Sequence, residues 1–112
     1  MKILRNNFEI ELPLRIIVCD RFWPRFKGLM FRMVPIVDEG ILLVPCNSIH
    51  MFFMFFSIDV VFLDENDVVV AVREKVKPNR LILPVARAVK TLELPVGAVG
   101  KHTIGVGDRI LY

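Results

Sequence analysis

Two polar residues whose side chains can take part in catalysis or metal binding lie in the most apolar part of the sequence. His50 and Asp59 fall within residues 49–63, which are otherwise almost entirely apolar. A histidine beside a carboxylate can act as a general base or contribute to a metal site. If residues 49–53 and 58–63 pair as strands, the two side chains approach each other. The ordinary alternative is a buried histidine hydrogen-bonded by a structural aspartate, because buried polar groups need partners.

Arg25 is a second candidate, since it precedes the sequence Gly-Leu-Met in an expected helix. A guanidinium at a helix edge can hold a carboxylate or phosphate through paired hydrogen bonds. The alternative is a structural ion pair with Asp38, Glu39 or Glu93.

Methionine and phenylalanine side chains form a third group that can line an apolar groove, since methionine adapts to varied partners. The group comprises Met30, Met33, Met51, Met54, Phe52, Phe53, Phe55 and Phe56. A strand buries alternate residues, so half of residues 52–56 must face something other than the core. Another part of the chain, a bound partner or a second copy can cover that half.

The sequence does not indicate a phosphate-binding loop or a zinc site. The glycines of the C-terminal third are spaced as turn residues, without the lysine and hydroxyl residue of a phosphate loop. Cys19 and Cys46 are too few and too far apart for a zinc cage. We interpret them as buried thiols, and the alternative is a disulfide or redox pair. We therefore predict no catalytic residue, metal or cofactor.

The charge pattern does not favour nucleic-acid binding. The formal net charge is only +3. A basic stripe at residues 73–80 lacks the interleaved aromatic side chains that stack on bases. The stripe is typical of a solvated strand or of a charged sheet edge.

The elements that carry these residues are mostly strands. Alternating or continuous apolar runs predict strands near residues 8–12, 15–19, 40–45, 49–56, 60–63, 68–76, 87–94 and 108–112. Helical spacing after Asp20 predicts a short helix at residues 21–32, and one helical turn is expected at 98–102. This pattern predicts a compact β-sandwich or distorted, jelly-roll-like barrel, and it disfavours a parallel βαβ sheet.

Length and composition predict a single domain covering residues 1–112. The apolar fraction of 54% excludes a disordered chain. The apolar stretch at 49–63 is too short for a spanning helix and contains Asp59. Residues 1–14 mix charged and apolar residues, so no secretory leader is recognised and a cytoplasmic location is expected.

Several segments together resemble the domain of unknown function 192 family over about residues 15–111. The segments are residues 25–30, 40–43, 48–54, 58–64, 92–97 and 105–108, in this order. The resemblance implies a compact β-rich domain and no established activity, and many members carry an export signal. Where members usually have threonine, arginine and often proline, this chain has Met51, Phe55 and Ser57.

The favoured function is a small non-enzymatic module that binds a small molecule or a protein in an apolar groove. Its candidate ligand-binding residues are Arg25, Met30, His50, Met54 and Asp59. One alternative is a small enzyme or metal-dependent protein using His50 and Asp59. Another is a structural domain that forms a homodimer through its phenylalanine-rich strand.

Overall fold

A computed structural model describes residues 1–20, 33–52 and 54–112 and confirms the mostly β class. Its elements are β1 (Lys2–Arg5), β2 (Phe8–Glu11), β3 (Arg15–Cys19), β4 (Glu39–Leu43), β5 (Ile49–His50), β6 (Ile58–Leu63), β7 (Val69–Val76), β8 (Leu81–Ile82), β9 (Lys90–Pro95), α2 (Ala98–His102) and β10 (Arg109–Leu111). The helical turn expected at 98–102 is thus present as α2. The helix expected at 21–32 lies outside the described residues.

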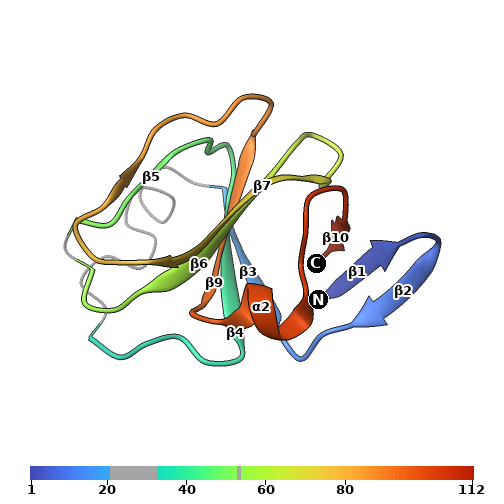
Figure 1. The fold of residues 1–112 in the computed structure, drawn as a ribbon, viewed down its shortest axis with the longest axis horizontal. Coiled ribbons are helices and arrows are strands. Elements are labelled where there is room, and N and C mark those ends of the chain that lie inside the picture. Colours follow the sequence, from blue (N-terminus) through green and yellow to red (C-terminus); the bar gives the residue numbers. More distant parts are fainter. Residues whose placement is uncertain (21–32, 53) are drawn as a thin grey trace.

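A five-stranded sheet with the order β3-β4-β9-β6-β7 forms the centre (Figure 1). Every residue of β6 is buried, because the sheet is covered on both faces. The hairpin of β6 and β7 agrees with the strands expected on either side of the polar turn at 64–67.

One pair in this sheet differs from the others. β3 and β4 run parallel, with Arg15 opposite Glu39 and Cys19 opposite Leu43. The other pairs of this sheet are antiparallel, so the sheet as a whole is not the parallel βαβ sheet that the sequence disfavoured. The connection through residues 20–38 is long enough for the crossover that a parallel pair needs.

Two further layers enclose the central sheet (Figure 1). The three-stranded sheet β10-β1-β2 and α2 share one core cluster with the central strands, which includes Ile3, Val99 and Ile110. The ribbon of β5 and β8 belongs to a second cluster, where Ile49 packs with Val60 and neighbouring residues. Because side chains alternate along β6, its odd and even residues serve opposite layers.

The pairing of residues 49–53 with 58–63, on which an approach of His50 to Asp59 depended, is not found among the described residues. β5 pairs with β8, placing His50 opposite Leu81. β6 has β7 and β9 as its neighbours, so both of its hydrogen-bonding edges are already occupied.

The methionine- and phenylalanine-rich segment after β5 is a turn and not a strand. The Met54 N–H donates to the Met51 carbonyl over 3.3 Å. These two methionines are buried, whereas Phe52 and Phe55 are exposed. The buried residues are three apart, as a turn places them, so the alternation assumed for a strand does not apply.

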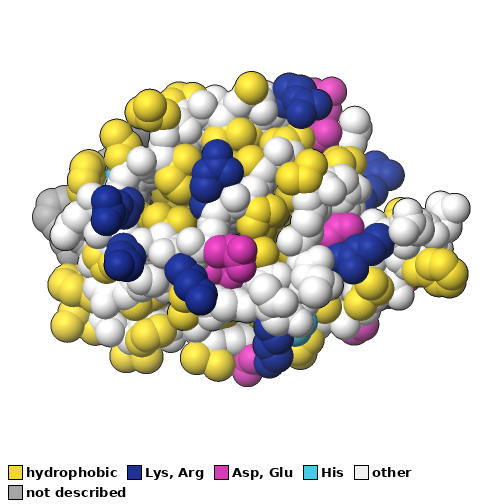
Figure 2. Space-filling model, in the orientation of Figure 1, with side chains coloured by type: hydrophobic (Ala, Val, Ile, Leu, Met, Phe, Trp, Pro, Cys, Tyr) yellow, Lys and Arg dark blue, Asp and Glu magenta, His cyan; other side chains and the backbone are white. Residues whose placement is uncertain are grey.

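Basic side chains on the face that carries β7 are separated by apolar ones (Figure 2). Arg73 and Lys75 of β7 are exposed, as the basic stripe predicted. No helix in the described ranges is long and apolar enough to cross a membrane.

An ion pair between Arg5 and Asp108 links β1 to the loop before β10. Arg5 donates to both carboxylate oxygens of Asp108, at 2.8 Å and 2.7 Å, and to the carbonyl of Thr103. The guanidinium lowers the pKa of the Asp108 carboxyl. Stabilisation from Asp108 is therefore complete above its unfolded pKa near 3.8 and is lost as pH falls through the lower folded value.

Replacing Arg5 tests this connection. We expect Arg5→Gln to lower the free energy of unfolding at pH 7, because the buried carboxylate of Asp108 loses two charge-assisted bonds. The variant should also lose part of the decline in stability at acid pH. Urea unfolding between pH 3 and pH 7 measures both effects, with exposed Arg80→Gln as the control. Equal losses in the two variants would contradict the prediction.

Candidate functional site

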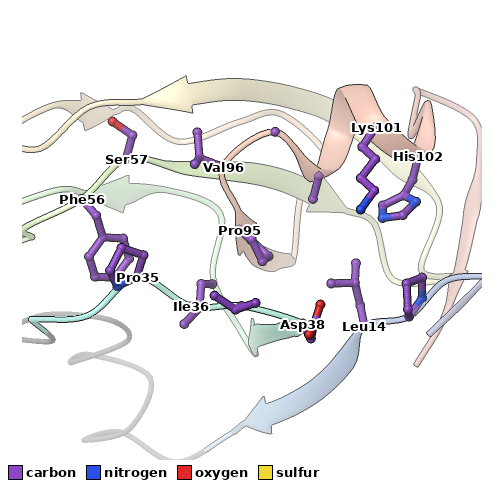
Figure 3. A pocket seen from close by; sticks show the side chains of 14 residues that line it. Leu14, Pro35, Ile36, Asp38, Phe56, Ser57, Pro95, Val96, Lys101 and His102 are labelled. Atoms are coloured by element: carbon purple, nitrogen blue, oxygen red, sulfur yellow. The ribbon is translucent and has the colours of Figure 1, made fainter.

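A groove of about 530 Å³ opens at one end of the central sheet (Figure 3). The groove is lined by Pro13, Leu14, Pro35, Ile36, Val37, Asp38, Phe56, Ser57, Pro95, Val96, Gly97, Ala98, Lys101 and His102. Pockets of roughly 300–1,000 Å³ with mostly apolar walls and a few polar groups are the usual form of small-molecule sites. We therefore treat this groove as the candidate site.

The topology explains why these distant segments meet. β3 and β4 begin at the same end of the sheet because they are parallel. β9 runs antiparallel to β4 and β6, so its last residue, Pro95, lies opposite Ile58 at the start of β6. The groove is therefore built from the segments before β3, β4 and β6 and from the chain that follows β9.

The walls of the groove are mainly apolar. Leu14, Ile36 and Ala98 are buried and also belong to the core. Val37 and Val96 are 68% and 50% exposed at the rim. The groove therefore combines a floor fixed by core packing with apolar rim residues that are accessible to a ligand.

Charged groups flank one half of the groove (Figure 3). Asp38 extends from the segment before β4, and Lys101 and His102 extend from α2 on the other side. Across the described ranges, no hydrogen bond or ion pair engages these three side chains. Their charges and polar atoms are thus available to a ligand.

Backbone contacts fix both charged walls. The Asp38 residue adopts φ 57°, and its carbonyl accepts the Arg15 N–H over 2.9 Å. The Lys101 N–H donates to the Gly97 carbonyl over 2.9 Å. The two walls are therefore positioned by the start of β3 and by the turn into α2.

Asp59 supports the groove from beneath without lining it. One carboxylate oxygen accepts the Val99 N–H in the first turn of α2 over 2.8 Å. The other accepts the Lys75 N–H of β7 over 2.9 Å, beside a register shift between β6 and β7. Asp59 is completely buried, so it joins α2, β6 and β7 by charge-assisted bonds.

The candidate ligand-binding residues predicted from the sequence do not lie together in the structure, as far as they are described. His50 is half-buried on β5 and stacks on Phe52, with ring centroids 5.4 Å apart. Asp59 faces α2, on the opposite side of the central sheet from the cluster that holds Ile49. Met54 is buried in that second cluster.

None of the three described candidates, His50, Met54 and Asp59, lines the groove. Arg25 and Met30 lie outside the described residues. Among the described residues, no three His, Cys, Asp or Glu side chains are grouped so that they could hold a metal ion.

Lys101 and His102 were not among the residues predicted from the sequence, and Asp38 was predicted only as an ion-pair partner of Arg25. Pro13, Pro35 and Pro95 do mark the strand ends that build the groove. Proline residues of this kind mark where strands end, but they do not show which strand ends come together in the fold.

Glu93 is a buried carboxyl on the face opposite α2. It is 4% exposed, and its register neighbours are Ile41 on β4 and Val60 on β6. Burial raises the pKa of Glu93 to about 8. Among the described residues its Oε2 atom has no hydrogen-bond partner that would offset the removal of the charge from water.

The carboxyl of Glu93 also affects the thiol of Cys19 electrostatically. Burial, followed by the negative charges of Glu93 and Asp20, raises the pKa of the Cys19 thiol. A raised pKa keeps the thiol protonated near neutral pH, where a nucleophile needs the thiolate. This environment agrees with a structural thiol.

The fold and groove define a small, mostly β domain with a mixed central sheet and a candidate ligand site at its strand ends. Family comparison identifies it more closely: the DUF192 model, described as "Uncharacterized ACR, COG1430", matches residues 4–112. The chain belongs to this family, whose function is unknown.

Archaeal proteins of the same family are clearly similar in sequence. The UPF0127 protein PH1112 of Pyrococcus horikoshii is 41% identical over 110 residues, covering 96% of this chain and 93% of the relative. A UPF0127 protein of Thermococcus sibiricus is 37% identical over 102 residues, or 86% of this chain. The matched region is only 64% of that relative's length.

Solved structures share the fold. A protein of unknown function from Novosphingobium aromaticivorans aligns with a TM-score of 0.82 at 20% identity, covering 99% of this chain and 82% of its own. A protein from Sinorhizobium meliloti aligns with a TM-score of 0.77 at 21% identity, covering 96% and 88%. At these identities the likeness establishes the fold alone.

Proposed function

We propose that the protein is a small non-enzymatic binding module whose ligand is a mostly apolar small molecule held in the groove at the strand ends. The observation that carries this proposal is the groove of about 530 Å³, with a buried apolar floor and polar side chains at its edge. Such sites bind by burying apolar surface, while a few polar groups set orientation.

The alternative of a His50 and Asp59 centre has less support. Asp59 uses both carboxylate oxygens to accept backbone N–H groups, which leaves it poorly placed to act as a base or metal ligand. Among the described residues that line the groove there is no thiol, and Ser57 is the single hydroxyl side chain. Binding therefore accounts for more of the site than catalysis does.

Indole, a neutral apolar probe, tests the groove directly. In a ¹⁵N–¹H NMR titration, we expect shifts centred on the amides of Leu14, Ile36 and Val96. Placing a carboxylate at the rim, by Val37→Asp or Val96→Asp, should weaken indole binding about fivefold, because the charge must be desolvated beside the probe.

Val106→Asp is the matched control, since Val106 is 70% exposed and lies outside the groove. Indole affinity in this variant should equal that of the unaltered protein. Shifts that centre elsewhere, or rim variants that bind indole as well as the control does, would overturn the proposed site.

A further inference from the structure

We infer that the natural occupant of the groove is a small zwitterion with an apolar body, of the size and chemistry of a hydrophobic dipeptide. This inference rests on the proposed function and names the ligand class. The structure places one acidic and one basic side chain across an apolar groove, and the described residues satisfy neither charge.

The charges favour a ligand that carries both signs over simpler ligands. A plain anion attracted by Lys101 would be repelled by Asp38, and a plain cation attracted by Asp38 would be repelled by Lys101, since both residues line the same groove. A neutral apolar molecule would leave both groups unused. Only a ligand with both charges gains from both walls, because complementary charges orient and select a partner.

The polar groups also define an orientation. An ammonium group of the ligand would face Asp38, and its carboxylate would face Lys101 and the neighbouring His102, whose ring can supply a further hydrogen bond. The apolar part would extend toward Ile36 and Phe56, the end of the groove away from α2 (Figure 3).

The size of the groove supports a ligand larger than one small amino acid. A volume of about 530 Å³ lies in the middle of the range for sites that enclose drug-sized molecules. Two apolar side chains on one short backbone would cover the apolar walls while keeping the two charged ends at the polar half.

The experiment uses four forms of one dipeptide, L-leucyl-L-phenylalanine. The forms are the free zwitterion, the N-acetyl form, the C-terminal amide and the form blocked at both ends. Isothermal titration calorimetry at pH 7 should show the zwitterion binding about five- to tenfold more tightly than either singly blocked form, since each block removes one charge-assisted contact.

Variants assign each end to its wall. Asp38→Asn keeps a residue that tolerates positive φ, and it should remove the preference for the free amine while retaining the preference for the free carboxylate. Lys101→Gln should do the reverse. Asp20→Asn and Lys77→Gln, both exposed and outside the groove, serve as matched controls and should bind all four forms as the unaltered protein does.

Two results would overturn the ligand class. The doubly blocked dipeptide binding as tightly as the zwitterion would show that the charges play no part. Absence of binding by all four forms would exclude dipeptide-like ligands. The indole titration decides the groove itself, so either failure here is distinguishable from failure of the proposed function.

Discussion

Asp59→Asn is expected to lower the free energy of unfolding by about 3–5 kcal/mol. Asp59 accepts the N–H groups of Lys75 and Val99 with both oxygens while completely buried. Asparagine offers one carbonyl and must turn its amide donor toward the other N–H. A bond to a charged acceptor is worth about 1.5–3 kcal/mol. Asparagine loses one such bond, makes the other weaker and turns a donor toward a buried N–H, which together remove much of a small domain's stability.

Urea unfolding at pH 7 measures this loss, and exposed Asp20→Asn is the control, with an expected change within about 0.5 kcal/mol. Hydrogen exchange of the unaltered protein adds an independent measurement. The Lys75 and Val99 amides should exchange only through global unfolding. A loss below about 1 kcal/mol, or rapid exchange at both amides, would refute the role assigned to Asp59.

Glu93→Gln is expected to have the opposite effect and to raise the free energy of unfolding at pH 7 by about 3 kcal/mol. The pKa of Glu93 rises from 4.5 to about 8 on folding, because burial penalises the carboxylate. The folded state therefore favours the protonated form. Its stability is unaffected by this group below pH 4.5 and declines as pH rises toward 8.

Glutamine keeps the shape of the protonated side chain but cannot ionise, so the gain should be small at pH 4.5 and greatest above pH 8. Urea unfolding of both proteins at pH 4.5, 7 and 9 measures it. Exposed Glu65→Gln should show no such trend. Stability curves for Glu93→Gln and the unaltered protein that stay parallel across this range would contradict the prediction.

The sequence predicted most strands because their apolar patterns are local. The runs that became β3, β6 and β7 are apolar or alternating over several residues, so each can be recognised without knowing its neighbours. The neighbour with which a strand pairs is not indicated by the residues of that strand. β5 carries only two residues and pairs with β8, which no pattern within residues 49–56 could indicate.

Burial of polar residues was equally hard to predict. The alternation around Thr91 and Glu93 correctly indicated a strand. Both side chains are buried, because β9 lies between β4 and β6 and is covered on both faces. The period-two alternation of a strand shows which residues share a face, but it does not show which element covers that face.

The candidate site was the least predictable part. Asp38, Lys101 and His102 each stand in a segment that is unremarkable by composition. They meet because parallel β3 and β4 begin at the sheet end where β9 stops. A site made from the ends of several strands depends on strand order, which a single sequence does not reveal.

The pairing of β1 with β10 bears on how the chain assembles during synthesis. Ile3 lies opposite Ile110, and both are almost fully buried (Figure 1). Strand β1 therefore pairs with residues that are translated more than a hundred positions later. Until β10 has been made, the hairpin of β1 and β2 leaves the apolar face around Ile3 without this neighbour, and the three-stranded layer is incomplete.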